Sequence, residues 1–402
     1  MKVLFISSVF PSPLRPNNGA FNSVMIRGLA AEDEVTVVAP VPWPVAYRAY
    51  RDGSSGQEVR DAGRVEVRHP IYFYTPKILR GQYGRFFEWS IAGAVNDVLS
   101  RFQPQLVMGY WSHPDGHAAV RIAQRLGVPG IVMVGGTDVL VLGKDMARQR
   151  AIRQVLDRAD SVVAVSHDLK RALGHWGCNT GKIHVVRRGV DTARFNQGPQ
   201  LESRARIGIP RNGKAILWVG HMVPVKGLDV LIEACANAAA VSDFHVYLVG
   251  DGTLRPRIEA RIAELGLRDR ITCVGYVAHD DLADWYRAAD LTVLPSQSEG
   301  IPNVLLESIA CGTPFVASHV GGIPEIADPL IDRLVTPGDV TALAHAMVTA
   351  LAAPSRLPRR TMPVSDQESA TRLREVLVAA VAARYRAAPR DLRTVGAAEA
   401  QP

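Results

Sequence analysis

Residues 291–318 read LTVLPSQSEGIPNVLLESIACGTPFVAS, and the fold can be inferred from the pattern in this segment. Its apolar ends, Leu291–Leu294 and Pro314–Ala317, predict two buried strands. Between them, a polar turn through Gly300 leads into a helix that begins near Pro302. Such a turn directs backbone N–H groups and the positive end of the helix dipole above the sheet. The segment therefore predicts an α/β unit with an anion-binding edge.

The same alternation of short apolar runs and helix-length amphipathic segments continues toward the N-terminus. The predicted strands there are Val3–Ile6, Glu34–Ala39, Leu106–Tyr110, Gly130–Val134, Ser161–Val165, Ala215–Val219, His245–Val249 and Ile271–Val274. Strands spaced by helices form βαβ units, so the sequence predicts an α/β fold of two doubly wound, Rossmann-like domains. We expect these domains to face one another across a cleft that holds the functional site.

Changes in composition indicate where the domains end. We expect a linker at 191–213, which mixes Pro, Gly and polar residues without a sustained period. It separates an N-terminal domain, 1–190, from a C-terminal domain, 214–365. A helix over 366–388 is expected to pack back on the N-terminal domain, and the last residues, 389–402, carry too little apolar surface to pack and are expected to be mobile.

The composition excludes extended disorder, because 47% of the 402 residues are hydrophobic and 21% are charged. The surplus of 46 Lys and Arg over 39 Asp and Glu favours anionic partners such as phosphates, acidic lipids or nucleic acid. The four cysteines contain no Cys-x2-Cys pair and indicate neither zinc nor a redox couple. The first apolar run is too short for a signal peptide and no window is long enough to span a membrane. We expect a cytoplasmic protein, at most peripheral at the inner face of the plasma membrane.

Two carboxylates stand in the segment quoted above, Glu299 in the turn and Glu307 in the helix. Ionised carboxylates accept hydrogen bonds from sugar hydroxyls. Their spacing within SEGIPNVLLESIACGTPFVASHVGGIPEIA resembles the signature of the family 4 glycosyltransferases, which are retaining enzymes with the GT-B fold. The segments WVGHMVPVKGLDVLIEA, 218–234, and LVGDGTLRPRIE, 248–259, also follow the order and spacing of that family.

The resemblance implies roles for individual residues. Glu299 would contact the donor sugar, and Glu307 would hold the ribose of a nucleotide-diphosphate sugar. Lys226 would pair with the diphosphate, which also suits the chemistry of a cation placed after a strand and turn, the alternative being a solvated lysine. The remaining donor contacts would come from the backbone of Gly300, Ile301, Pro302 and Asn303 for the sugar and diphosphate, and from Gly250 and Asp251 for the base.

Three positions depart from the family pattern. His221 stands where an arginine beside the diphosphate is usual, so either Lys226 carries more of the anion binding or the pH dependence changes. Gly135 stands where the family often has a histidine near the reacting carbon, so no side chain there can contribute. Arg188 replaces a common asparagine and adds a charge near the expected cleft.

Loops of the N-terminal domain supply the candidates for the acceptor side. His113, with His117 nearby, follows a predicted strand and is a candidate catalytic group in place of the missing histidine, the alternative being a surface-loop histidine. Asp138 shares a loop with Gly135. Gly19 ends a turn that either lets the backbone approach a phosphate or acceptor, or is an ordinary βα loop.

The stretch from Tyr72 to Trp89, YFYTPKILRGQYGRFFEW, combines aromatic with basic residues. This composition suits an anionic membrane or a lipid-linked acceptor, and equally a buried helix and strand. It also suits single-stranded nucleic acid, but nothing else here resembles an RNA-binding module, so we expect no nucleic-acid partner. The sequence contains no Asp-x-Asp triplet and no His/Cys/carboxylate cluster, so we expect no metal and no cofactor other than the nucleotide sugar.

The sequence thus predicts a retaining glycosyltransferase of the hexosyltransferase type, which moves a sugar from a nucleotide-diphosphate donor to a hydroxyl acceptor. The acceptor would be a saccharide or lipid-linked saccharide in surface-polysaccharide or glycoconjugate synthesis. Catalysis would rest on orientation and charge stabilisation, with attack on the face that the diphosphate leaves. The alternatives are a nucleotide-sugar epimerase or sugar-phosphate synthase on the same fold, and a catalytically weak nucleotide-sugar-binding subunit.

Overall fold

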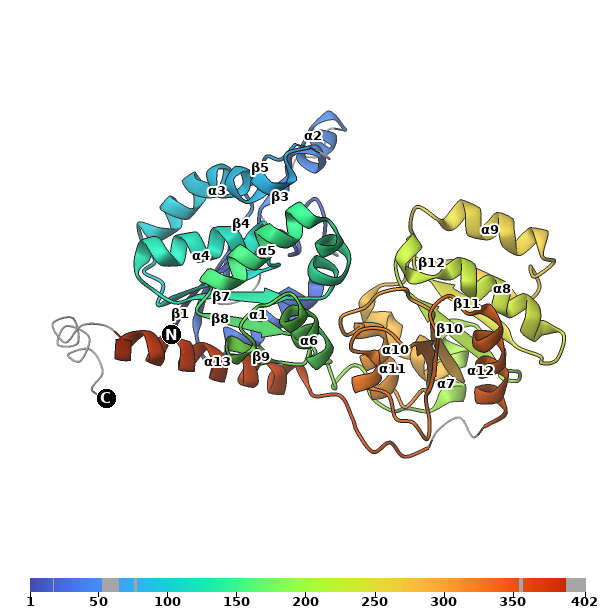
Figure 1. Cartoon of the computed structure of the whole chain (residues 1–402). Helices are drawn as coiled ribbons and strands as arrows, with labels where there is room; N and C mark the ends of the chain where they lie inside the picture. The colour runs from blue at the N-terminus through green and yellow to red at the C-terminus, as the bar shows by residue number, and fades with distance from the viewer. Residues whose placement is uncertain (17, 53–64, 76–77, 354–356, 388–402) are drawn as a thin grey trace. The chain divides into compact units, whose positions relative to one another are not determined.

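The computed structural model describes residues 1–16, 18–52, 65–75, 78–353 and 357–387. The chain divides into two compact units, the first formed by residues 1–187 with the chain from 367 onward, and the second by 188–366. Each unit is a parallel sheet with helices on both faces (Figure 1). The predicted α/β class and its two Rossmann-like halves are therefore confirmed. The tail predicted to be mobile, 389–402, lies outside the described residues.

The sheet of the first unit has seven strands in the order β4-β2-β1-β6-β7-β8-β9, all parallel to their neighbours. The order reverses direction between β1 and β6, which pair through Ile6 and Gly109 at their carboxyl ends. These strands, with the separate parallel pair of β3 and β5, are β1 (Lys2–Ile6), β2 (Glu34–Val38), β3 (Val41–Pro42), β4 (Val65–Arg68), β5 (Ile71–Tyr72), β6 (Leu106–Tyr110), β7 (Gly130–Val134), β8 (Ser161–Ala164) and β9 (Ile183–Val185).

Helices cover both faces of this sheet, which explains why its strands are apolar without alternation. Along β1, Val3 and Phe5 pack toward α1 and α13, whereas Leu4 and Ile6 pack toward α3 and α4. Figure 1 shows α13, drawn in red, on the same side as α1 and opposite α3 and α4. The helices are α1 (Ala20–Leu29), α2 (Trp43–Arg51), α3 (Tyr83–Leu99), α4 (Asp115–Leu126), α5 (Met146–Arg158), α6 (His167–His175) and α13 (Asp366–Ala387), with the short turns η1 (Arg80–Gln82), η2 (Thr137–Val141), η3 (Leu142–Lys144) and η4 (Thr180–Lys182).

The second unit repeats this plan with six parallel strands in the order β12-β11-β10-β13-β14-β15. Its direction reverses between β10 and β13. The strands are β10 (Ala215–Val219), β11 (His245–Val249), β12 (Ile271–Gly275), β13 (Leu291–Leu294), β14 (Phe315–Ser318) and β15 (Arg333–Val335). The helices are α7 (Gln200–Ile207), α8 (Leu228–Ala239), α9 (Arg255–Glu264), α10 (Leu282–Ala288), α11 (Asn303–Ala310) and α12 (Val340–Ala352), with the turns η5 (Pro224–Lys226), η6 (His279–Asp281) and η7 (Ile323–Glu325).

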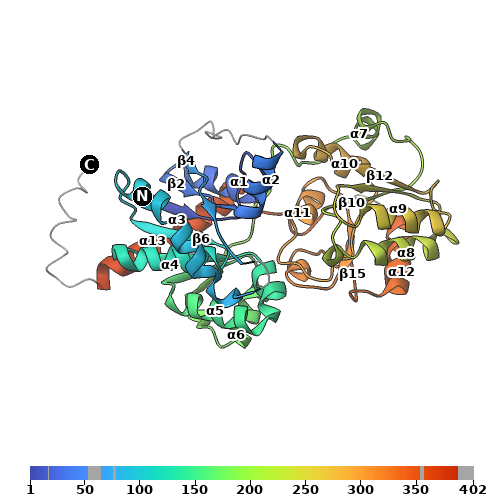
Figure 2. The same cartoon turned by 90° about the horizontal axis from the view of Figure 1, so that it is seen from above.

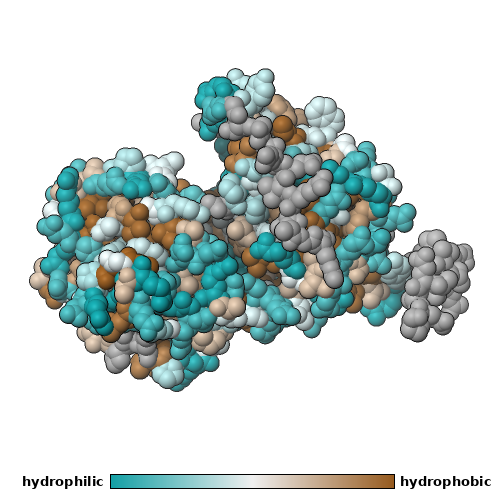
Figure 3. Space-filling view, turned by 180° about the vertical axis from the view of Figure 1, so that it is seen from behind, coloured by the Kyte–Doolittle hydropathy of each residue, from teal (hydrophilic) through white to brown (hydrophobic). Residues whose placement is uncertain are grey.

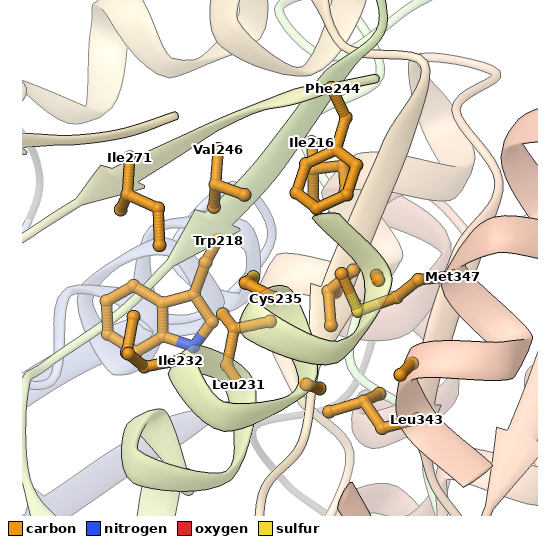
Figure 4. Close-up of a cluster of buried hydrophobic side chains, with 14 of the residues drawn as sticks. Ile216, Trp218, Leu231, Ile232, Cys235, Phe244, Val246, Ile271, Leu343 and Met347 are labelled. Atoms are coloured by element: carbon orange, nitrogen blue, oxygen red, sulfur yellow. The ribbon is translucent and has the colours of Figure 1, made fainter. Parts of the chain in front are cut away.

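The main core of the second unit lies between the sheet and the helices α8, α9 and α12, while α7, α10 and α11 lie on the other side (Figure 2). Trp218 of β10 is fully buried at its centre. Figure 4 shows this indole among apolar side chains from the neighbouring strands and from α8 and α12. A smaller core beneath α11, around Leu305 and Ile309, fixes the helix that follows the turn of Glu299.

The segment predicted to be a linker, 191–213, differs from that expectation because it contains α7. Arg204 of α7 is buried and forms an ion pair with Asp290, with 2.7 Å between its Nη2 and a carboxylate oxygen. The same guanidinium donates to the carbonyls of Ala288 and Arg211. A buried, fully hydrogen-bonded arginine rather than an apolar stripe anchors this helix, so the hydrophobic period of the segment is weak.

Helix α13 follows the second unit in sequence but packs in the core of the first. Leu373 and Leu377 lie in the same buried cluster as Val3 and Phe5. Arg374 adds an ion pair with the buried carboxylate of Asp33 at 2.9 Å. The helix over 366–388 was expected to pack on the N-terminal domain, and α13 lies there.

Candidate functional site

The second unit presents two loops at the point where its strand order reverses. In doubly wound sheets, ligands bind outside the carboxyl ends of the strands at this point. Here the two loops follow β10 and β13, and the backbone N–H of Gln297 donates to the carbonyl of Val225 at 2.8 Å, which ties them together. Gly227 has φ +66°, and a Cβ there would collide with the carbonyl of Pro295, so only glycine permits this approach.

Lys226 and Glu299 meet at this junction. Lys226 ends the turn after β10, and its Nζ donates to Oε1 of Glu299, in the turn after β13, at 2.7 Å. Both side chains are mostly buried, with 23% and 11% of their surface exposed. A lysine held in this way is no ordinary surface cation. A phosphate that enters the site would find an oriented positive charge close to the carboxylate that the resemblance places against the sugar.

Glu307 projects from α11 into a set of hydrogen-bond donors. The residue is only 6% exposed. Its Oε1 lies 3.1 Å from Nε2 of His279, and its Oε2 accepts from the Tyr286 hydroxyl at 2.8 Å. The hydrogen bond from His279 to this carboxylate raises the pKa of the imidazole. Each carboxylate oxygen keeps a further lone pair, so the group is held in place and can still accept from a ligand hydroxyl.

The first four residues after Glu299 lie where α11 begins. Gly300, Ile301 and Pro302 are buried, and α11 starts at Asn303 without a side-chain cap in the described part of the chain. The N–H groups of the first turn thus have no side-chain acceptor there, and the helix dipole favours an anion at this end. Arg188 donates to Oδ1 of Asn303 at 3.4 Å, which places that guanidinium beside the helix start.

His221 and the Gly250–Asp251 pair lie at the next loops of the same edge. Nδ1 of the exposed His221 lies 3.2 Å from the carbonyl oxygen of Asp251. The Asp251 carboxylate accepts from the N–H of Gly252 at 2.7 Å and pairs with Arg255 at 3.1 Å, and these contacts lower its pKa. The structure therefore brings every predicted donor-side residue to one edge of the second unit.

The first unit has its own reversal point, where the loops after β1 and β6 meet. Asp115, the first residue of α4, is fully buried and accepts hydrogen bonds from the backbone N–H and the hydroxyl of Ser8. Burial outweighs these bonds and raises the pKa of its carboxyl to about 7. The sequence contained no signal for this residue beyond its place at the start of a helix.

His113 lies near this junction and is buried rather than on a surface loop, so the surface-loop alternative is wrong. Burial, with the charges of His117 and Arg148, lowers the pKa of its imidazole to about 4, which keeps it neutral near pH 7. The two histidine rings lie 6.2 Å apart, and His117 also contacts Glu88 at 3.5 Å. A neutral imidazole can accept a proton, but it lacks the second proton that an imidazolium ion gives up as a general acid.

Asp138, Gly135 and Gly19 take part in the local backbone structure of this unit. The carboxylate of Asp138 accepts four hydrogen bonds from the N–H and hydroxyl of Ser112 and the N–H groups of Gly135 and Gly136. Burial nevertheless raises its pKa. Gly19 has φ +67° and lies against the carbonyl of Val9 at the start of α1, so its conformation explains the glycine without a ligand.

A cavity of about 180 Å³ opens beside His113 in the first unit. Its lining comes from β5 and the following loop, from α3 and α5, from the loops after β1 and β6, and from the turns η2 and η3. Aromatic side chains form a large part of it, and the lining includes Tyr72, Tyr74, Tyr83, Trp111, His113, Asp138 and Arg148.

Two family models match the chain. The model described as Glycosyltransferase Family 4 matches residues 21–194, and that described as Glycosyl transferases group 1 matches 213–353. The first match lies largely in the first unit and the second within the second unit, so together they cover most of the chain. The chain belongs to the family 4 glycosyltransferases.

Similar proteins include two whose names specify a reaction or pathway. The chain is 28% identical over 359 residues to TuaC of Bacillus subtilis (strain 168), assigned to teichuronic acid biosynthesis as a glycosyltransferase, and the match covers 86% of this chain and 88% of TuaC. It is 35% identical over 263 residues to a D-inositol 3-phosphate glycosyltransferase of Nocardiopsis dassonvillei, covering 60% of this chain and 61% of that relative. The chain thus spans less than two thirds of the second relative's length.

Solved structures share the fold at lower identity. Sucrose-phosphate synthase from Thermosynechococcus elongatus superposes with a TM-score of 0.76 at 22% identity, over 94% of this chain and 97% of that one. HepE of Anabaena in complex with UDP-glucose superposes with a TM-score of 0.70 at 19% identity, over 94% of this chain and all of that one.

Several residues of this family 4 glycosyltransferase lie at its candidate site without having been predicted. His279 and Tyr286 hold Glu307, and Arg194 contacts Nδ1 of His279 at 3.1 Å. They come from η6, α10 and the segment before α7, and each looks in sequence like an ordinary helix or loop residue. Only their position in space reveals the contact with Glu307.

Among the residues described, no three His, Cys, Asp or Glu side chains gather in a way that could hold a metal ion. No helix within the described residues combines the length and apolarity that a membrane span requires.

The raised pKa of Asp115 makes the stability of this glycosyltransferase depend on pH. Between about pH 4 and 7 the folded state holds a proton that the unfolded chain has released, so stability falls as the pH rises through this window. Asp115→Asn removes this titration. We expect its free energy of unfolding, relative to the wild type, to increase by at most about 4 kcal/mol from pH 4 to 7. Denaturant unfolding at each pH measures this; the exposed Asp97→Asn is the control, and a difference that does not vary with pH contradicts the prediction.

Proposed function

We propose that this glycosyltransferase transfers a hexose from a nucleotide-diphosphate donor to a hydroxyl acceptor, with retention at the anomeric carbon. The observation that carries the proposal is the Lys226–Glu299 pair at the reversal point of the second sheet, with 2.7 Å between Nζ and Oε1. In this proposal the lysine binds the diphosphate and the adjacent carboxylate binds the sugar. Beside it, the start of α11 offers uncapped N–H groups to the same anion.

The proposed donor complex assigns each end of the nucleotide sugar to a part of this edge. The ribose hydroxyls would donate to Glu307, which His279 and Tyr286 hold in place. The diphosphate would lie against Lys226 and the first turn of α11, without a metal ion. The base would lie near Gly250 and Asp251.

Catalysis in this proposal comes from positioning and from charge. As the bond between the sugar and the diphosphate breaks, negative charge grows on the leaving oxygen, and Lys226 stabilises it. The acceptor hydroxyl attacks from the same face, and a diphosphate oxygen takes its proton. Glu299 orients the sugar through its hydroxyls. In the first unit, His113 is neutral and would orient the acceptor hydroxyl through a hydrogen bond.

The similarity to TuaC supports a role in polymer assembly rather than in nucleotide-sugar metabolism. TuaC, which aligns with most of this chain, is assigned to teichuronic acid biosynthesis, and HepE was solved with UDP-glucose. We propose a saccharide or lipid-linked saccharide acceptor. A sugar-phosphate synthase is the second candidate, favoured by the fold shared with sucrose-phosphate synthase, and it would require a phosphorylated acceptor.

A thermal-shift panel of UDP, GDP and ADP sugars, each with magnesium and with a chelator, tests the donor assignment. A ligand at 100 times its Kd stabilises a protein by about 2.7 kcal/mol. We expect one base to raise the melting temperature equally with and without metal, and Glu307→Ala to abolish this shift. The exposed Glu264→Ala on α9 serves as the matched control. No shift with any donor would favour a chain that does not bind nucleotide sugars.

An exposed surface of the first unit also favours peripheral contact with an anionic membrane. Tyr50 of α2 is 84% exposed and Trp89 of α3 is 77% exposed. Trp43 stacks on Phe73 at 6.0 Å, and Phe73 meets Phe86 at 6.1 Å, so a row of rings connects α2 to α3. We call the exposed part of this surface the aromatic face; it comprises Tyr47, Tyr50, Ile71, Phe73, Ile78, Leu79 and Trp89.

The charge of this region suits acidic headgroups. Arg48 and Arg85 are exposed beside the aromatic face, and neither has an ion pair within the described residues. Glu88 is the nearby acid on α3, and it already contacts His117 and Arg121. On the projection that α2 forms, hydrophobic and hydrophilic residues lie side by side (Figure 3).

Co-sedimentation with vesicles of phosphatidylglycerol and phosphatidylcholine tests this contact. We expect the wild type to bind and high salt to release it, because headgroup attraction is screened. Tyr50→Ser with Trp89→Ser should reduce binding about tenfold or more, since two exposed rings no longer enter the interface. Val241→Ser with Leu330→Ser removes comparable exposed apolar side chains from the second unit and should leave binding unchanged. Equal sedimentation of the two variants would rule out the aromatic face.

A further inference from the structure

The cavity in the first unit has the size and lining of a pocket for one sugar ring. Its volume is about 180 Å³, and an apolar cavity of roughly 150 Å³ is known to hold benzene, so a six-membered ring fits. Tyr74 contacts Tyr72 at 5.8 Å and Tyr83 at 5.6 Å between ring centroids, and Trp111 joins them in the wall. Aromatic walls with a few polar groups are typical of pockets that bind small molecules.

The polar groups of this wall include the positively charged guanidinium of Arg148. Its Cζ lies 5.7 Å from the centroid of the Tyr83 ring. Its backbone N–H donates to Asp145 at 3.1 Å, but the other oxygen of Asp145 pairs with Arg80 at 2.7 Å. Within the described residues no carboxylate pairs with the Arg148 side chain.

Asp138 also lines the cavity, and its carboxylate already accepts four hydrogen bonds from the protein. Two further titratable groups of the wall add no negative charge that would oppose an anion. His113 is held neutral, in part by the charge of Arg148 itself. The buried Tyr72 hydroxyl has a raised pKa and is also neutral. A planar guanidinium that lies over a ring and has no carboxylate partner among the described residues matches the geometry of a carboxylate or phosphate.

We propose that this cavity binds the ring of an acceptor sugar that carries a carboxylate or a phosphate, and that Arg148 binds this anionic group. The inference rests on the proposed function, since it gives the acceptor of the same reaction its chemical class. The aromatic side chains cover the faces of the sugar ring, and Arg148 selects for the charge. A neutral sugar fills the same space but leaves a partly buried cation without its partner.

Ligand-observed NMR titrations of the full chain with D-glucuronate, glucose 6-phosphate and glucose test this proposal. We expect at least one of the two anionic sugars to bind about tenfold or more tightly than glucose, as a charge-assisted hydrogen bond implies. The stronger of the two anions identifies carboxylate or phosphate as the recognised group. Arg148→Gln should remove the preference, and Arg148→Lys should keep part of it. The exposed Arg125→Gln on α4 is the matched control and should bind like the wild type.

The outcomes separate this inference from the function on which it rests. Nucleotide diphosphates are titrated into the same samples. If the nucleotide binds but the chain prefers glucose, binds no sugar, or keeps its anion preference in Arg148→Gln, the inference is overturned and the proposed function stands. If neither nucleotide nor sugar binds, the proposed function fails with it. Melting temperatures of the variants exclude misfolding as the cause of a loss.

Discussion

Lys226→Ala lowers kcat for sugar transfer by about 10²–10³-fold, the usual effect of removing one oriented group that stabilises transition-state charge. The amine is held 2.7 Å from Glu299 before any ligand arrives, so it needs no rearrangement to meet the diphosphate. KM for the donor changes less than kcat, because the charge that Lys226 meets grows as the sugar bond breaks. Steady-state kinetics with the donor found by thermal shift measures both constants.

Further variants separate the role of the charge from that of the ion pair. Lys226→Arg keeps the charge and should recover part of the activity. The exposed Lys214→Ala, before β10, should be indistinguishable from the wild type. Because Lys226 and Glu299 contact each other, Lys226→Ala with Glu299→Gln should lose less than the product of the two single losses. A kcat for Lys226→Ala within threefold of the wild type would show that the lysine does not act on the leaving group.

Glu307→Gln weakens donor binding by about 10- to 100-fold, the expected loss of one or two hydrogen bonds to a charged group. The carboxylate is nearly buried and both oxygens are already oriented, so the side chain loses little conformational entropy when it accepts hydrogen bonds from ribose hydroxyls. Isothermal titration with the nucleoside diphosphate measures the Kd.

The neighbours of Glu307 give the internal controls. Tyr286→Phe removes one donor to the carboxylate but leaves its charge, so we expect a smaller loss of affinity than for Glu307→Gln. His279→Gln also leaves the charge, and the protonation of His279 no longer modulates binding in this variant. An unchanged Kd in Glu307→Gln, in a folded protein, would remove Glu307 from the nucleotide site.

The fold was predictable from the sequence because the central strands are buried on both faces. Runs such as Ala215–Val219 are wholly apolar, and the turn after Leu294 has the residues that begin a helix near Pro302. Helix α7 was not predictable, since Arg204 holds it through Asp290, far along the chain. The hydrophobic period of the local sequence does not reveal this ion pair.

The candidate site was predictable only in part. Lys226 and Glu299 stand out by charge and family resemblance, and the structure adds that they touch. The composition of the aromatic stretch 72–89 was compatible with a buried or an exposed position. In the structure, some of its aromatic residues are buried and others are exposed. Phe87 is fully buried and Trp89 exposed, because side chains two positions apart on a helix point to roughly opposite sides, here toward the sheet and toward the solvent. The partners of Glu307 were not predictable, because tertiary packing alone brings them together.

We propose that this chain transfers a sugar from a nucleotide-diphosphate donor with retention, and the stereochemistry of the product tests this. The most direct measurement is proton NMR of the product formed by the purified chain from an α-linked donor, with saccharide acceptors that include neutral, carboxylated and phosphorylated sugars. We expect transfer in the presence of a chelator, an α linkage in the product, and loss of this product in Lys226→Ala. A β-linked product would contradict retention, and no transfer from any donor that binds would contradict the enzymatic function itself.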